Sequence, residues 1–272
     1  MTKEEVAAVL DEIATLLEVK GENPFRANAY RNGARAVQNL AGDIEDVVTE
    51  SRSVSPRPGT QVLLGARYAL VRPEIRRQRP VRAQEPAQPF RAIVALGDDD
   101  PHGQAGELAK LLLNCPKVSR VDVLVRPYHP NLPALQELAA ACPERLDVVS
   151  ETGEVPLRIA RCHFAVTAGN AWSLELACVG VPQLLVVQSE VHWPTAQRLE
   201  EEGAATCLGW HANVSPATVR QAVNDLLGDA LERQAMSRCG RKLIDGRGPD
   251  RLVTALEVLM HPSRQVQVRE AA

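Results

Sequence analysis

One segment of the chain has residue types that could do chemistry. It consists of a short apolar run, a glycine turn and a helix with a glutamate near its start. Residues 163–166 are the apolar run, Gly169 is the turn signal, and residues 173–178 resume helical spacing. In an α/β sheet such a junction lies at the carboxyl end of a strand and points free amide N–H groups at an anion. Glu175 could accept hydrogen bonds from a ribose diol, or it could simply complement the helix dipole on a solvated face.

Alternating strands and helices are expected to position this junction. Near-continuous apolar strands separated by amphipathic helices predict a parallel sheet covered on both faces, and right-handed crossovers make it Rossmann-like. The fold class predicted is therefore α/β. The expected strands are residues 91–96, 118–125, 146–150, 164–168 and 183–187, and the expected helices include 106–113 and 132–142.

The stretch TAGNAWSLELACVGVP, residues 167–182, resembles AGGSTSWELACLGVP of the UDP-sugar hydrolase of pseudaminic acid synthesis. More loosely, it is similar to the carboxyl-terminal donor domain of glycosyltransferase family 28, which has the GT-B fold. The resemblance covers about residues 60 to 260 and implies UDP-sugar hydrolysis or glycosyl transfer. Further stretches agree in order, namely VLLGARYALVRPEIR (62–76), IVALGDDDP (93–101), AQRLEEEGAATCLGW (196–210) and LIDGRGPDRLVTAL (243–256).

The resemblance implies a nucleotide-sugar site in which amides after Gly97 and Gly169 hold the diphosphate and Glu175 holds the ribose. Trp172 and Trp193 fall at ligand-side loops, where each could stack on uracil or a sugar ring, or could fill an emptied pocket. The residues that match the site are Gly97, Asp98, Gly169, Asn170, Ala171, Trp172, Glu175, Glu190 and His192.

Several of these positions depart from the family pattern. Asn170 stands in place of a second glycine, and Ala171 and Trp172 replace a serine and a threonine that contact the diphosphate. Of the family's Glu-Asn-Gln step only Glu190 is retained, followed by Val191 and His192.

Near Gly97 an aspartate replaces the family's second glycine. Asp98, with Asp99 and Asp100 beside it, should repel a diphosphate unless a divalent cation such as Mg²⁺ intervenes. Apart from that possible Mg²⁺, no cofactor is expected.

The resemblance also implies a preceding Rossmann-like domain that carries a Gly-x-Gly-His loop and the catalytic base. No comparable sequence occurs in this chain, so no catalytic residue is assigned. Two hypotheses follow. Either a partner chain completes the cleft, or the protein is a noncatalytic binding or scaffold protein, a pseudoenzyme.

The amino-terminal 50 residues predict a small all-helical module. Thr2 and Glu5 form a capping box for a first helix, Asn23 begins a second, and Asp43 opens a short third. The expected apolar face of the first helix is Val6, Val9, Leu10, Ile13, Leu16 and Leu17.

The phrase KGENPFRANAYRNGARAVQNL resembles KGENPFRVRAYRRAARAIENL in the helical domain of bacterial family X DNA polymerase. The polymerase continues into a DNA-gripping helix-hairpin-helix of the Gly-x-Gly type. Here the chain turns into SRSVSPRPGTQ, so we expect that element to be absent. Arg26, Arg31 and Arg35 could still bind phosphates from one helix face, or they could form a solvated face. The net charge of −3 favours the second alternative.

Length and composition predict two unequal domains and a cytoplasmic location. With 272 residues and 45% hydrophobic content, the chain allows an α/β core and a helical module, and it has no apolar run of about 20 residues. The expected boundaries are a module at 1–50, a linker and interdomain segment at 51–89, a Rossmann-like domain at 90–262 and a tail at 263–272.

Cysteines and histidines show no metal-ligand spacing. The six cysteines form no C-x-x-C pair and predict reduced thiols in a cytosolic protein. His102, His163, His192 and His211 are scattered, which argues against a transition-metal site. Among them we single out His192, which could face the nucleotide or lie at the surface.

Overall fold

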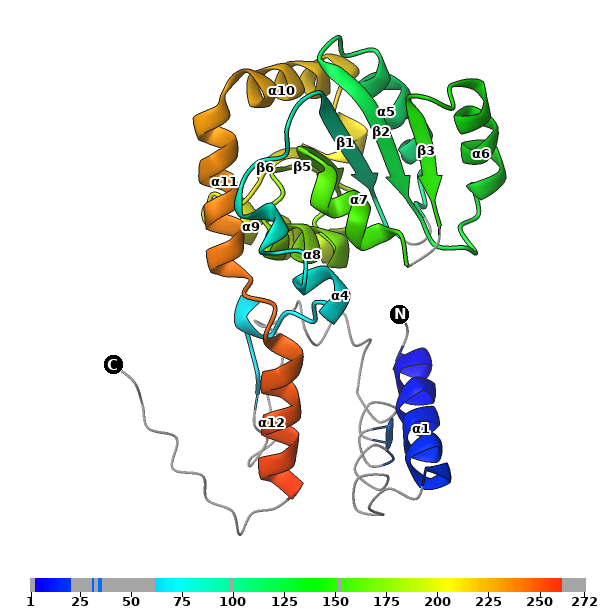
Figure 1. Ribbon diagram of the computed structural model, residues 1–272, viewed down its shortest axis with the longest axis vertical. Helices are drawn as coiled ribbons and strands as arrows, with labels where there is room; N and C mark the ends of the chain where they lie inside the picture. Colours follow the sequence, from blue (N-terminus) through cyan, green and yellow to red (C-terminus); the bar gives the residue numbers. More distant parts are fainter. Residues whose placement is uncertain are drawn as a thin grey trace. The chain divides into compact units, whose positions relative to one another are not determined.

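The computed structural model describes residues 3–20, 31, 34–35, 62–97, 100–150 and 153–260. Two compact units are present. One comprises Ala66–Pro249, and the other comprises Met1–Gly65 with Asp250–Ala272. The larger unit contains the six-stranded sheet (Figure 1).

A six-stranded sheet with the strand order β3-β2-β1-β4-β5-β6 forms the centre of the larger unit. All five neighbouring strand pairs are parallel. The predicted Rossmann-like α/β fold is therefore confirmed. The strands are β1 (Phe90–Ala95), β2 (Val118–Leu124), β3 (Leu146–Val149), β4 (Phe164–Thr167), β5 (Gln183–Val187) and β6 (Thr206–Trp210).

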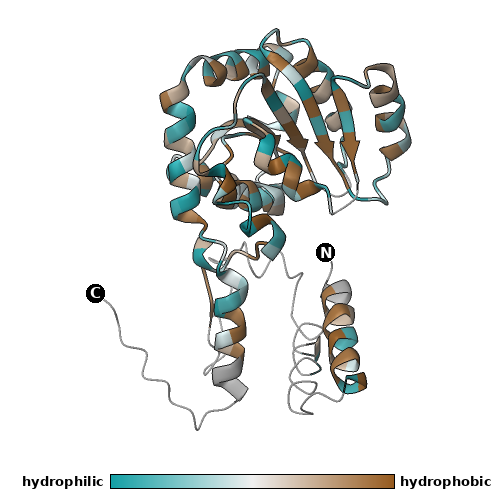
Figure 2. Ribbon diagram, in the orientation of Figure 1, coloured by the Kyte–Doolittle hydropathy of each residue, from teal (hydrophilic) through white to brown (hydrophobic). Residues whose placement is uncertain are grey.

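The central strands are mostly apolar because both faces of the sheet are covered. Every residue of β4 and β5 is buried. In β1, Ile93 and Ala95 belong to one apolar cluster, and Ala92 and Val94 belong to the other, as the alternation of side chains along a strand requires. In Figure 2 the strands accordingly carry mostly hydrophobic colours.

Helices cover the two faces of the sheet as two sets. The apolar cluster on one face draws on α4, α7, α8 and α9, and that on the other draws on α5, α6 and α10. The helices of the larger unit are α4 (Pro73–Arg76), α5 (Gln104–Leu113), α6 (Leu132–Ala141), α7 (Val155–Arg161), α8 (Ala171–Val179), α9 (Trp193–Glu201), α10 (Pro216–Gly228) and α11 (Ala230–Leu243). Shorter 3-10 turns are η1 (Ala66–Tyr68), η2 (Val81–Ala83), η3 (Glu190–His192) and η4 (His211–Asn213), and α12 spans Gly248–Met260.

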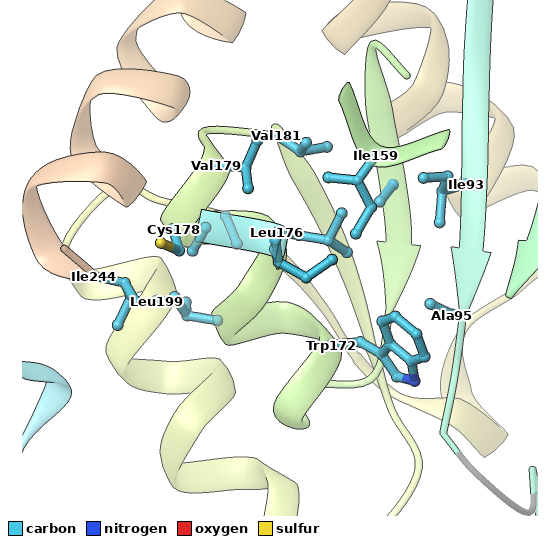
Figure 3. Packing of buried hydrophobic residues seen from close by; sticks show 14 of the residues in the cluster. Ile93, Ala95, Ile159, Trp172, Leu176, Cys178, Val179, Val181, Leu199 and Ile244 are labelled. Carbon is cyan, nitrogen blue, oxygen red and sulfur yellow. The ribbon is translucent and has the colours of Figure 1, made fainter. Parts of the chain in front are cut away.

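Helix α8 lies at the centre of one cluster. Figure 3 shows Trp172 and Leu176 of this helix together with Ile93 and Ile159. Helix α11 approaches so closely that a Cβ on Gly240 would lie 2.9 Å from the carbonyl oxygen of Ala177. Only glycine permits this contact between the two helices.

The strand positions expected from the sequence agree with the structure to within one or two residues, but β6 was not predicted. All five residues of β6 are half-buried, and the strand lies at the edge of the sheet. Its residues, TCLGW, include a glycine and lack the continuous apolar run of a central strand. The periodicity therefore gave no strand signal there.

Residues 66–89, expected as part of an interdomain segment, belong to the compact α/β unit. Ile75 of α4 is fully buried in the cluster around α8. The Arg79 guanidinium donates to the carbonyl oxygens of Cys178 and Ile244, the latter at 2.7 Å. These contacts attach the segment to α8.

In the smaller unit, α1 (Lys3–Val19) confirms the first predicted helix. Its expected apolar face is only partly covered, because Val9 and Leu16 are exposed, whereas Ala7 and Ala14 are fully buried. The proposed cap at Thr2 and the helix starts at Asn23 and Asp43 lie outside the described residues.

Two further expectations concern membranes and cysteines. Among the described residues, no helix is long and apolar enough to cross a bilayer. All six cysteines are free thiols, and Cys115, Cys162 and Cys178 are buried. Burial raises the pKa of the Cys162 thiol to about 12, so this thiol is inert as a nucleophile near neutral pH.

A substitution in α4 tests whether the segment before β1 is part of the core. We expect Ile75→Ala to lower the free energy of unfolding by about 2–5 kcal/mol, because it leaves a cavity at a fully buried position. Val81 of the same segment is 66% exposed, so Val81→Ala should change that free energy by less than about 0.5 kcal/mol. Urea unfolding measures both. Equal effects of the two variants would show that the segment does not contribute to the core.

His163, the residue just before β4, is buried beside the start of β1. The amide of Arg91 donates to His163 Nδ1 at 3.0 Å, and Nε2 lies 3.0 Å from the carbonyl oxygen of Pro86, so the neutral ring donates through Nε2. Burial lowers the pKa of His163 below its ordinary value because an imidazolium loses hydration there.

This depressed pKa predicts a pH dependence of stability. Protonation favours the unfolded chain, so the contribution of His163 is present above the unfolded pKa of about 6.5 and is lost as the pH falls through the lower folded value. We expect the wild type to lose up to about 1.4 kcal/mol per pH unit in that window. In His163→Gln, whose amide can keep both hydrogen bonds, this slope should disappear. Urea unfolding between pH 7 and 5 is the measurement, and identical slopes would contradict the prediction.

Candidate functional site

The candidate site lies at the carboxyl ends of β1 and β4, where the strand order reverses. From β1 the chain proceeds to β2 and β3 on one side of the sheet, and it then returns to β4, β5 and β6 on the other. In open α/β sheets the loops diverge at this position and leave a crevice in which ligands bind. The turns that follow β1 and β4 contain Gly97 and Gly169, as the sequence predicts.

Both glycines have backbone angles that favour glycine. Gly97 has φ +140° and Gly169 has φ +81°. A Cβ on Gly169 would lie 2.9 Å from both the carbonyl oxygen of His192 and Cβ of Ala196. The turn after β4 therefore packs directly against η3 and α9.

Asn170 holds the two turns together. Its Nδ2 donates to the carbonyl oxygen of Leu96 at 3.0 Å, and its Oδ1 accepts from the amide of Trp172 at 3.1 Å. The Ser173 hydroxyl accepts from the amide of Gly169 at 3.0 Å. Side chains of the protein thus occupy part of the amide array at the start of α8, while Ala171, the first residue of the helix, is exposed.

The amino terminus of α5 is also capped from within the chain. Asp100, which is 2% exposed and has φ +38°, accepts from the amides of Gln104 at 3.0 Å and Ala105 at 2.9 Å. Its carboxylate stands where a ligand anion would otherwise meet this helix. Asp98 and Asp99 lie outside the described residues.

Trp172 is a buried residue and not an open stacking surface. Only 6% of it is exposed. The Arg72 guanidinium lies 5.0 Å from its ring centroid, and that of Arg126 lies 5.8 Å away. The ring fills space beside the sheet, which agrees with the pocket-filling alternative. Trp193, in contrast, is 37% exposed at the start of α9.

Glu175 is bound to Arg72 by a two-pronged ion pair. Arg72 donates to Oε1 from Nε at 2.8 Å and from its backbone amide at 3.2 Å, and to Oε2 from Nη2 at 2.7 Å. Glu175 is 6% exposed, so the alternative of a solvated, dipole-complementing glutamate is wrong. The pair attaches α8 to the segment that leads into α4. The ribose role of Glu175 stays a prediction.

Glu190 and His192 begin and end the turn η3 that follows β5. Glu190 is exposed and His192 is half-buried. The backbone of His192 contacts the Gly169 turn, as described above. The structure therefore gathers Gly97, Gly169, Asn170 and His192 at one edge of the sheet, whereas Trp172 and Glu175 point into the packed interior.

Sequence reasoning missed several side chains at this edge. The rings of His102 and His211 stack with centroids 3.7 Å apart, although the two residues follow different strands. His102 Nε2 lies 3.2 Å from the carbonyl oxygen of Gln188. Burial, followed by the nearby His102, lowers the pKa of His211. Nothing in the spacing of these residues signalled the contact, since only the fold brings the β1 and β6 loops together.

Arg72 and Arg126 were also missed as members of the site. Arg72 lies within the stretch VLLGARYALVRPEIR, so the resemblance marked its neighbourhood but not its partner. As to metals, the described residues include no cluster of three or more His, Cys, Asp or Glu side chains able to hold an ion. Both carboxylate oxygens of Asp100 already accept amides, so Mg²⁺ near Asp98, Asp99 and Asp100 stays an expectation.

The chain is similar to one curated protein and to several solved structures. It is 24% identical over 169 residues to the spore coat polysaccharide biosynthesis protein SpsG of Bacillus subtilis (strain 168). The aligned residues make up 61% of this chain and 50% of SpsG. The chain thus spans about half the length of the curated relative that it matches.

Two solved structures support the fold. MurG of Acinetobacter baumannii is 17% identical with a TM-score of 0.51, over 62% of this chain and 52% of that one. The spinosyn rhamnosyltransferase SpnG is 20% identical with a TM-score of 0.50, over 65% and 46% of the respective chains. The Rossmann-like unit therefore has the fold of about one half of each of these GT-B chains.

The amino-terminal 54 residues match a protein family described as a helix-hairpin-helix domain. This match supports a helical module at the amino terminus, but it does not test the expected absence of a Gly-x-Gly element after position 50, which stays a prediction. The expectation rested on the residues after position 50, whereas the match falls almost entirely before them. Of the three arginines proposed for DNA, Arg31 pairs with Glu18 through its two terminal guanidinium nitrogens, and Arg26 lies outside the described residues.

The Arg72–Glu175 pair predicts a coupled stability effect. We expect Arg72→Met to lower the free energy of unfolding by about 3 kcal/mol, because it leaves a buried carboxylate without its guanidinium. The double variant Arg72→Met/Glu175→Gln should recover most of that loss. Urea unfolding of the single and double variants is the measurement.

An exposed ion pair on α9 supplies the control. Arg198 and Glu202 are 59% and 39% exposed, so Arg198→Met should cost less than about 1 kcal/mol. If Arg72→Met cost no more than Arg198→Met, the Arg72–Glu175 pair would have no special part in holding α8.

Proposed function

We propose that residues 66–249 bind the nucleotide part of a nucleotide sugar at the carboxyl edge of β1 and β4. The observation that carries this proposal is the position of the Gly97 and Gly169 turns on the two sides of the strand reversal. A crevice at such a reversal is where parallel α/β sheets hold nucleotides. The similarity to SpsG, a spore coat polysaccharide biosynthesis protein, and the fold shared with GT-B structures support a nucleotide sugar as the ligand.

The proposed contacts follow from the geometry of the two turns. Diphosphate oxygens would accept from the amides of the Gly97 turn and of Ala171, the exposed first residue of α8. The amino terminus of α8 adds the favourable end of a helix dipole. Glu190 and His192 border the same edge from η3 and complete the set that would face the ligand.

Glu175 enters the proposal mainly as a positioning residue. A carboxylate has about four acceptor sites, and Arg72 uses three of them. Because Glu175 is only 6% exposed, a ribose hydroxyl would have to enter the packed interior to reach the remaining site on Oε2. Arg72 would then orient the glutamate for the ribose as well as hold α8 in place.

The finer proposal is a UDP-sugar as ligand and glycosyl transfer or UDP-sugar hydrolysis as activity. This part rests on the resemblance of residues 167–182 and on the relatives that the chain matches. The catalytic base is then assigned to a partner chain, which also completes the cleft.

A noncatalytic scaffold is the second candidate, and a specific observation favours it. Asp100 caps α5 and Asn170 caps α8, so side chains of the protein already occupy positions that an anion would take. Trp172 is also buried, so it offers a base no stacking surface. A scaffold would retain the fold without any affinity for nucleotides.

Calorimetric titration with UDP and a UDP-N-acetylhexosamine, with and without Mg²⁺, separates the two candidates. We expect saturable binding by the wild type. Ala171→Glu should weaken binding at least tenfold, because a carboxylate at the first helical position repels the diphosphate. The same carboxylate favours the helix, so folding should be maintained.

The matched control is Ala171→Gln, which has nearly the same shape without the charge. We expect its dissociation constant to stay within about threefold of the wild-type value. If the wild type released no heat at millimolar ligand, nucleotide binding would be refuted and the scaffold would stand. If Ala171→Glu and Ala171→Gln weakened binding equally, the diphosphate would not bind at this position.

A further inference from the structure

A hollow lined by arginines lies at the other end of the strands from the candidate site. Its volume is about 510 Å³, and its lining includes Arg82, Arg233, Arg238 and Arg241. Pro182, which directly precedes β5, also lines it. The hollow is therefore near the amino ends of the strands, whereas the Gly97 and Gly169 turns follow the carboxyl ends.

The lining carries an excess of positive charge. Glu85 is its one acidic residue, and Glu85 already pairs with Arg233, whose Nε donates to Oε1 at 2.6 Å. Arg82 donates to the carbonyl oxygen of Gly180 at 3.3 Å, and Arg241 donates to that of Arg79 at 2.8 Å. Carbonyl oxygens satisfy donors but carry no countercharge. With four arginines and one carboxylate, the lining therefore has an excess of three positive charges.

Among these arginines, Arg82 has a buried hydrogen-bond donor that lacks a partner in the described part of the chain. It is 3% exposed, and its Nε is buried without an acceptor among the described residues. Burial lowers the pKa of Arg82, whereas the nearby Cys162 and Glu85 act in the opposite direction and Arg241 adds to the lowering. A buried charged donor without an acceptor is costly, and an anionic oxygen in the hollow would remove that cost.

We propose that this hollow is a second binding site, for a phosphate-bearing anion with at least two negative charges. Guanidinium groups match phosphate oxygens through paired N–H donors, and here they converge from η2 and from α11. The half-buried Ser237 adds a hydroxyl to the same lining. The volume is within the range of small-molecule sites and exceeds what a single phosphate needs.

The proposal is independent of the nucleotide site, because it uses other residues at the other end of the strands. An anion here would neutralise arginines that connect α11 to the segment before β1. Binding should therefore stabilise the α/β unit as well as occupy the hollow.

Titration calorimetry with inorganic pyrophosphate at constant ionic strength is the test. We expect saturable binding that Arg238→Gln weakens about tenfold, because it removes one charged donor. Arg238 is exposed, so this variant should fold. Lys242→Gln is the matched control, since Lys242 is an exposed cation on the same helix that does not line the hollow. Its dissociation constant should stay within about twofold of the wild-type value.

A second variant examines the buried arginine. Arg82→Lys keeps the charge but loses the Nε donor and the planar fork, so it should also weaken pyrophosphate binding. Equal effects of Arg238→Gln and Lys242→Gln would overturn the proposal, as would no saturable binding at millimolar pyrophosphate. Binding that persists in Arg238→Gln and is displaced by UDP would place the anion at the nucleotide edge and would also overturn it.

Discussion

The burial of helix α8 on almost every side is the constraint on which the rest of the α/β unit depends. Seven of its nine residues are buried. The sheet, α4, α7 and α11 all contact this helix. Such a helix tolerates polar groups only where each has a fixed partner. Arg72 supplies that partner for Glu175, and Gly240 allows the backbone of α11 to approach Ala177.

The two ends of α8 have different electrostatic surroundings, and both proposed sites follow from them. At its amino terminus the exposed Ala171 opens toward the strand reversal, where an anion gains from the helix dipole. Near its carboxyl terminus, Arg79 binds the carbonyl of Cys178 and Arg82 binds that of Gly180. Cations belong at this end of a helix, but more arginines gather there than one helix end requires. The surplus charge is what makes the second hollow a site for anions.

Much of this architecture could be predicted from the sequence, and the reason differs between its parts. Strands β1, β4 and β5 gave near-continuous apolar runs because both faces of the sheet are covered there, whereas the half-buried edge strand β6 gave none. The turn at Gly169 was predictable because a tight turn between a strand and a helix needs a residue with positive φ.

Long-range pairing was not predictable in the same way. Arg72 and Glu175 are 103 residues apart, and the stacked rings of His102 and His211 follow different strands. Local spacing contains no information about such contacts, which exist only once the sheet has formed. The cap at Asp100 was missed for a related reason. Three consecutive aspartates predicted repulsion of a phosphate, but local spacing did not show that one of them satisfies the amides of α5.

The most direct test of the account is amide NMR of the ¹⁵N-labelled chain during titration with UDP. Binding at the strand reversal predicts selective shifts of the Gly97, Gly169 and Ala171 amides that saturate together. The amides of α11, which border the other hollow, should change much less. Shifts concentrated on α11, or no shift at the two glycine turns at millimolar UDP, would contradict the claim that the carboxyl edge of β1 and β4 binds a nucleotide.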